Sequence, residues 1–112
     1  MSKEEVLANF QIAIDNKTYE HDGNLLLDDL LERAQKIVIN DREGLVEALR
    51  YWISLREQFR TEKAVILTKY LVLKELKLDL DKLRDDIVSG KYLPGNHTGR
   101  VDRALKAIDT NN

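Results

Sequence analysis

The fold is decided by residues 24–39, which read NLLLDDLLERAQKIVI. Apolar side chains recur along this stretch at helical spacing, at Leu27, Leu30, Leu31, Ala34, Ile37 and Val38. Asp22 precedes the stretch as a cap residue, and acidic side chains lie near its start, where the helix dipole favours negative charge. The stretch therefore predicts an amphipathic helix that buries one face in a core.

Two structures are open for the first twenty residues. Ser2 and Glu5 form a capping-box pattern ahead of apolar residues at three-four spacing, which favours a helix. Apolar residues also alternate from Phe10 to Ile14, and a turn sequence follows. A hairpin over about residues 9–20 is therefore the alternative.

The middle of the chain predicts either one long helix or two helices over residues 42–77. Asp41 is placed to cap the first of them, and residues 45–77 contain neither Gly nor Pro. Within this range only Thr61-Glu62-Lys63 suggests a new helix start. Residues 64–73 are apolar nearly all round, which favours a central, buried helix over a buried strand.

Two shorter helices are expected in the last third of the chain. Asp79 or Asp81 caps the first, and Gly90 ends it at the position where a left-handed residue is needed. Residues 92–96 read as a turn, and Thr98 can cap the last helix.

These segments together predict an all-α fold, a small bundle of five or six helices that forms a single domain over residues 1–112. An α+β fold with an N-terminal hairpin is the alternative. We expect ten side chains in the core: Leu30, Leu31, Ala34, Val38, Leu49, Trp52, Phe59, Ile66, Tyr70 and Leu73.

The composition excludes several protein classes. The chain is 43% hydrophobic and 34% charged and has no cysteine, so disulfide scaffolds and thiolate metal sites are excluded. No uncharged apolar stretch approaches 18 residues, and the first residues lack the apolar core of a signal peptide. We therefore expect a cytoplasmic protein that does not bind membranes.

The titratable residues predict neither catalysis nor a metal site, so we expect no enzyme and no cofactor. His21 and His97 lie 76 positions apart, and both read as exposed loop residues. Acidic clusters at residues 28–32 and 79–86 lie at helix starts, where carboxylates favourably meet the helix dipole.

The net charge of −2 is unevenly distributed along the chain. Residues 1–40 carry 4 basic and 8 acidic side chains, whereas residues 41–112 carry 14 basic and 12 acidic ones. Such asymmetry can reflect opposed faces that recognise a charged partner or associate head to tail, with ordinary solvated surface as the alternative. The candidate partner-binding residues are Asp28, Asp29, Glu32, Arg50, Arg56, Arg60, Lys63, Arg100, Arg103 and Lys106.

These features predict a non-enzymatic protein-binding helical module, such as an adaptor, chaperone, inhibitor or immunity-type protein, that acts through charged and apolar helix faces. Its expected partner is another protein or a second copy of itself in a homodimer. The alternative is a small nucleic-acid-associated regulator or packaging accessory that uses the basic helix faces. An acidic chain disfavours this alternative, because nucleic-acid-binding domains usually concentrate Lys and Arg.

Overall fold

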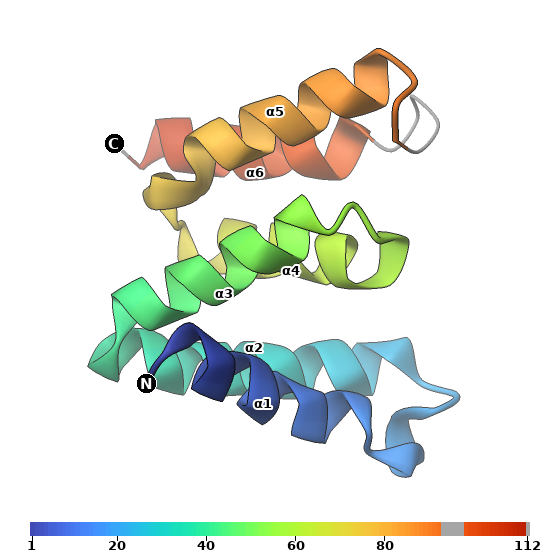
Figure 1. Cartoon of the computed structure of the whole chain (residues 1–112), viewed down its shortest axis with the longest axis vertical. Helices are drawn as coiled ribbons and strands as arrows, with labels where there is room; N and C mark the ends of the chain where they lie inside the picture. Colours follow the sequence, from blue (N-terminus) through green and yellow to red (C-terminus); the bar gives the residue numbers. More distant parts are fainter. Residues whose placement is uncertain (93–97, 112) are drawn as a thin grey trace. The chain divides into compact units, whose positions relative to one another are not determined.

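The computed structural model describes residues 1–92 and 98–111. These residues form six α-helices, two 3-10 turns and no strand (Figure 1). The helices are α1 (Lys3–Ile14), α2 (Gly23–Asn40), α3 (Arg42–Ser54), α4 (Gln58–Leu71), α5 (Lys77–Val88) and α6 (Thr98–Thr110), and the 3-10 turns are Lys17–Tyr19 and Lys74–Leu76.

The all-α prediction is confirmed, and the helix count over the described residues lies within the expected five or six. The alternative hairpin over residues 9–20 does not form, because its first half belongs to α1 and its second half contains a 3-10 turn. In the part of the chain described above, no helix is long and apolar enough to cross a membrane.

The chain divides into two compact units, which we call unit 1 (residues 1–48) and unit 2 (residues 49–112). The boundary falls inside α3, so Arg42–Ala48 belongs to unit 1 and Leu49–Ser54 to unit 2. The single domain over residues 1–112 stays a prediction, and we describe each unit in turn.

Unit 1 is built on a hairpin of α1 and α2, which lie side by side (Figure 1). Arg33 of α2 ties the two helices together, because its Nη1 donates to the backbone oxygen and to the side-chain oxygen of Asn9, both at 3.2 Å. The core of unit 1 contains Val6, Phe10 and Ala13 of α1 and Leu26, Leu30, Ala34 and Ile37 of α2.

The helix starts in unit 1 follow the caps that the sequence predicts. Ser2 Oγ accepts from the Glu5 backbone N–H, and the Glu5 carboxylate accepts from the Ser2 N–H, both at 3.2 Å. Asp22 caps α2 by accepting from two backbone N–H groups at its start. Because these caps satisfy donors that a helix leaves free, they fix where α1 and α2 begin.

Asp41 caps α3, as its sequence position predicts. Its Oδ1 accepts from the Gly44 N–H at 2.9 Å, and its Oδ2 contacts the amino group of Met1 at 2.8 Å. These bonds lower the pKa of the Asp41 carboxyl. A Cβ atom at position 44 would collide with the Asp41 carboxylate and the Met1 carbonyl oxygen, so this turn requires glycine.

In unit 2, α6 packs against both α4 and α5. Its core takes small and branched side chains from all three helices: Thr61, Ala64, Val65, Leu67 and Thr68 of α4, Leu80, Leu83 and Ile87 of α5, and Val101, Ala104 and Ile108 of α6. Leu73 and Leu76, in the segment of chain that connects α4 to α5, are also fully buried.

Residues 42–77 form two α-helices, and the break comes before the predicted start at Thr61. Arg56 adopts a left-handed backbone conformation with φ 51° and ends α3. The Thr61 hydroxyl then closes the corner, since it donates to the Trp52 carbonyl oxygen at 2.8 Å and accepts from the Glu57 N–H at 3.1 Å. Thr61 therefore lies inside α4 and stabilises the corner instead of starting the helix.

Gly90 ends α5 as predicted. It has φ 80°, its N–H donates to Ile87, and the N–H of Lys91 donates to the Asp86 carbonyl oxygen at 2.9 Å, which together form a Schellman motif. Thr98 begins α6. Of the turn predicted over residues 92–96, only Tyr92 lies within the described residues.

The predicted core is partly wrong at α4. Five of the ten residues are buried (Leu30, Ala34, Leu49, Trp52 and Leu73), and four are half-buried (Leu31, Val38, Phe59 and Ile66). Tyr70 is 59% exposed, so its assignment to the core is incorrect. The cause is that the buried face of α4 is the one that carries Thr61 and Thr68. Tyr70 lies on the opposite face and is therefore directed to solvent.

Candidate functional site

The acidic residues predicted to bind a partner have different surroundings on α2. Asp29 has a structural role, because it accepts from Arg33 Nε at 2.8 Å, and its hydrogen bond with the Tyr19 hydroxyl raises the pKa of that phenol. Asp28 and Glu32 are exposed. Of the three, these two therefore present their carboxylates to solvent.

The outer face of α2 combines these carboxylates with apolar side chains. Leu25 is 47% exposed, and Ile39 is 82% exposed. Residues 25, 28, 32 and 39 follow one stripe of the helix, since their spacing of three, four and seven keeps them on the same side. We call Leu25, Asp28, Glu32 and Ile39 the acidic stripe.

Two of the predicted basic residues connect α5 to the end of α3. Arg50 Nε donates to Asp79 at 3.1 Å. Arg56 Nε donates to Asp86 at 3.0 Å, and its Nη1 donates to the Ile53 carbonyl oxygen at 2.7 Å. Charge-assisted hydrogen bonds of this kind stabilise a fold, so Arg50 and Arg56 are structural residues of unit 2.

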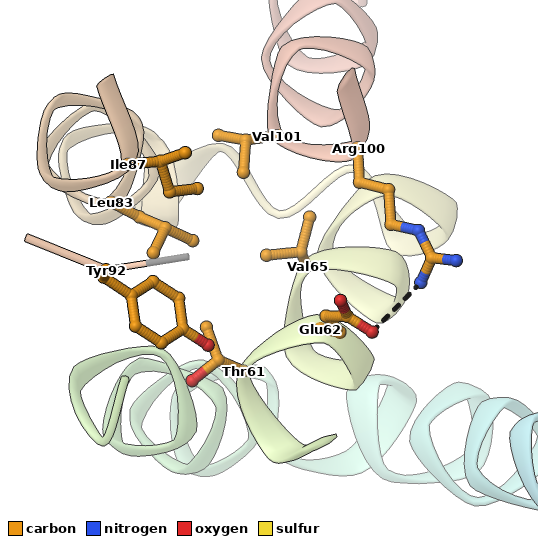
Figure 2. Close-up of a pocket in the computed structure, with 8 residues that line it drawn as sticks. All are labelled: Thr61, Glu62, Val65, Leu83, Ile87, Tyr92, Arg100 and Val101. Carbon is orange, nitrogen blue, oxygen red and sulfur yellow. Dashed lines mark hydrogen bonds and ion pairs between the residues drawn. The ribbon is translucent and has the colours of Figure 1, made fainter. Parts of the chain in front are cut away.

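Two further predicted arginines also make ion pairs within unit 2. Arg60 Nη1 lies 3.1 Å from Glu57, one helical turn away. Arg100 of α6 reaches Glu62 of α4, with 3.5 Å between Nη1 and Oε2 (Figure 2). Neither arginine is therefore available to a partner without first giving up a carboxylate.

The remaining predicted cations are Lys63, Arg103 and Lys106. Arg103 and Lys106 are exposed on α6. Lys63 Nζ lies 4.9 Å from the centre of the Phe59 ring, a cation–π geometry. The predicted basic residues thus divide into four that form ion pairs and three that pair with no carboxylate of the described residues.

One face of α4, with Tyr70 exposed and its other side chains half-buried, is the basic and aromatic counterpart of the acidic stripe. Residues 59, 63, 66 and 70 lie one turn apart on the side opposite to Thr61. Lys69 Nζ lies 5.6 Å from the centre of the Tyr70 ring. We call Phe59, Lys63, Ile66, Lys69 and Tyr70 the aromatic stripe.

The charges differ more between the two units than between residues 1–40 and residues 41–112, the division used in the sequence analysis. Unit 1 carries 5 basic and 11 acidic side chains, a balance of −6. Unit 2 carries 13 basic and 9 acidic side chains, a balance of +4. Each compact unit is therefore a charged body, and the two bodies have opposite signs.

Unit 2 also encloses a small cavity, shown in Figure 2. Its volume of about 20 Å³ is enough for one water molecule and is far below the size of a typical ligand pocket. It is lined by Thr61, Glu62, Val65, Leu83, Ile87, Tyr92, Arg100 and Val101. The cavity therefore offers no site for an organic substrate.

One polar atom in this cavity has no partner. The Tyr92 hydroxyl is buried and forms no hydrogen bond with any described residue, although it points toward Thr61 (Figure 2). Burial raises the pKa of the Tyr92 phenol, while the neighbouring Thr61 hydroxyl acts in the opposite direction. The Thr61 hydroxyl gives its own proton to the Trp52 carbonyl oxygen.

The described residues contain no group of three His, Asp or Glu side chains that could hold a metal ion. His21 is exposed in the turn before α2, as expected, whereas His97 lies outside the described residues. In the acidic cluster at residues 79–86, Asp79 and Asp86 bind the arginines described above, which gives them a structural role.

Sequence reasoning did not find the two stripes as surfaces. It placed Tyr70 in the core and did not single out Ile39. The signal was present in the helical period: once Leu26 and Leu30 face the core, Ile39 falls on the opposite side of α2.

No protein-family model, curated protein or solved structure matches this chain.

Proposed function

We propose that this chain is a non-enzymatic protein-binding module that acts through charged and apolar faces of its helices. The observation that carries the proposal is the division of charge, −6 on unit 1 and +4 on unit 2, with an outward stripe of apolar side chains in each. Charge complementarity selects a partner and accelerates encounter, and exposed apolar side chains supply the contact area.

The ion pairs in unit 2 reduce the set of residues that we expect to bind a partner. Arg50 and Arg56 hold α5, so reversing either charge would alter folding as well as binding. Asp28 and Glu32 are exposed, and the pair that Glu32 forms with Lys36 at 3.1 Å is open to solvent. These two carboxylates are therefore the better probes of a binding role.

The test is affinity capture from an extract of the source cells, with three forms of the chain compared. The first is the wild type, the second is Asp28→Lys/Glu32→Lys, and the third is the control Glu4→Lys/Asp15→Lys, which makes the same charge change within α1 and directly after it. Circular dichroism should show that all three are equally helical. Mass spectrometry then identifies the proteins that each form retains.

We expect a protein that the wild type and the control retain and that Asp28→Lys/Glu32→Lys loses. Retention of the same proteins by all three forms would contradict a role for the acidic stripe. Nucleic acid that copurifies with the chain, and that high salt removes, would instead support the nucleic-acid alternative.

A further inference from the structure

The two stripes are complementary in chemistry. The acidic stripe of α2 carries Asp28 and Glu32 between two exposed apolar side chains. The aromatic stripe of α4 carries Lys63 and Lys69 beside exposed or half-exposed rings. A helix that presents carboxylates and aliphatic side chains is the kind of partner that a helix with lysines and rings binds.

The dimensions of the stripes also agree. At 1.5 Å per residue, residues 25 and 39 are about 21 Å apart along α2, and residues 59 and 70 are about 17 Å apart along α4. Asp28 and Glu32 lie one turn apart within the first, and the two lysines lie within the second. Two helices packed along such lengths bring both charge pairs and both apolar groups into contact.

We infer that the chain associates with a second copy of itself, with the acidic stripe of one copy docked on the aromatic stripe of the other. The inference rests on the proposed function, because it names the partner of the same helix faces. A second copy is the occupant that the charges favour, since each chain carries both a −6 unit and a +4 unit. A two-fold arrangement would form the contact twice.

Sedimentation velocity over a range of concentrations tests the inference. At low salt the wild type should sediment as a species larger than the 13.0 kDa chain, and raising the salt should return it to the monomer, because ions screen exposed charges. Tyr70→Ser should weaken self-association, because it removes an apolar contact. The salt dependence should remain, because the substitution removes no charge.

A charge swap gives the sharpest form of the test. Asp28→Lys/Glu32→Lys makes the stripe on α2 basic, so that it repels α4 of another copy. Lys63→Glu/Lys69→Glu makes the stripe on α4 acidic, so that it repels α2 of another copy. Each variant alone should self-associate at least about tenfold more weakly than the wild type.

When the two variants are mixed, both contacts become complementary again. The basic α2 of the first variant faces the acidic α4 of the second, and the acidic α2 of the second faces the basic α4 of the first. A mixed complex that neither variant forms alone is the expected result. Glu4→Lys/Asp15→Lys in place of the first variant is the control: this chain keeps both stripes and should associate with itself as the wild type does. It should not form an equally stable mixed complex with Lys63→Glu/Lys69→Glu, because only one of the two contacts would be complementary.

A chain that is monomeric at every salt and concentration would overturn the inference, as would a mixture that stays monomeric. In that case the affinity capture described above still tests the proposed function separately. If the acidic stripe still retains another protein, the proposed function holds and only the second copy is wrong as the partner.

Discussion

Units 1 and 2 differ in what their charged side chains do. In unit 2, arginines and lysines connect helices to one another: Arg84 bonds Asp102 of α6 at 2.6 Å, and Lys77 pairs with Asp109 at 3.0 Å. In unit 1, one arginine, Arg33, joins α1 to α2, and acidic side chains outnumber basic ones by more than two to one.

This difference indicates where binding residues are to be found. A cation that already pairs with a carboxylate of its own fold must give up that bond to bind a partner, whereas an exposed carboxylate such as Asp28 binds without this cost. The basic character of unit 2 is therefore largely structural in its arginines, whereas Asp28 and Glu32 of unit 1 lie exposed on α2.

Leu30→Ala, in unit 1, should have the largest effect on stability. Leu30 is fully buried, and loss of a buried leucine side chain costs about 3 kcal/mol. Because we predict a single domain, the urea midpoint should fall equally by far-UV circular dichroism and by fluorescence of Trp52, the one tryptophan, which belongs to unit 2.

The matched variant in the other unit is Leu83→Ala, which removes an equally buried leucine. It should shift both signals in the same way. If Leu30→Ala moves the circular dichroism midpoint and leaves the Trp52 midpoint at its wild-type value, the units unfold separately and the single domain is wrong.

Arg56→Ala should have the next largest effect, a loss of about 2 kcal/mol, because it removes hydrogen bonds to the Asp86 carboxylate and to the end of α3. The backbone at this position is left-handed, with φ 51°. Arg56→Gly should therefore recover about 1 kcal/mol of that loss. Urea titration of both variants measures the difference, and equal loss in the two would show that the backbone conformation contributes nothing.

Local signals in the sequence account for the helices and for four of their ends. The start of α5 was predicted wrongly, because the helix begins at Lys77 and the expected caps Asp79 and Asp81 lie inside it. Ser2, Asp22, Asp41 and Gly90 each act on backbone groups within a few residues, so their roles are visible without knowledge of the fold. The end of α3 is different, because the left-handed residue there is Arg56 and no glycine marks it.

The candidate surfaces needed information that the sequence does not carry locally. Residues 64–73 are apolar on all sides, so their pattern leaves open which side of α4 packs on its neighbours. The ion pairs of Arg50 and Arg56 span 29 and 30 residues, which no local pattern indicates. Sequence reasoning therefore grouped structural arginines with Lys63 and Lys106, which form no ion pair among the described residues, as candidate binding residues.

Two glycines, one in each unit, should respond to alanine with opposite signs. Gly90 has φ 80°, so Gly90→Ala should cost about 1 kcal/mol. Gly23 begins α2 with open space around the position of a Cβ atom, so Gly23→Ala should stabilise by about 0.5 kcal/mol. Differential scanning calorimetry measures both, and destabilisation by Gly23→Ala would contradict the helical assignment at that position.

Tyr92→Phe should also have a small effect at neutral pH. The substitution removes a buried hydroxyl that has no hydrogen-bond partner among the described residues, so stability should stay the same or rise by about 1 kcal/mol. A loss of stability instead would show that the hydroxyl binds a water molecule in the adjoining cavity, which has room for one. Tyr70→Phe, at an exposed position, is the control for removal of a phenol hydroxyl.

At alkaline pH the stability of Tyr92→Phe should differ from that of the wild type. The sign of the difference follows from the raised pKa of Tyr92. The folded chain keeps this proton to higher pH than the unfolded chain does. The stabilisation is therefore complete below the unfolded pKa of about 10 and is lost as the pH rises through the folded value. Urea midpoints at about pH 8 and about pH 10.5 should fall less for Tyr92→Phe than for the wild type. An equal fall in both would show that burial of this phenol in unit 2 is not linked to stability.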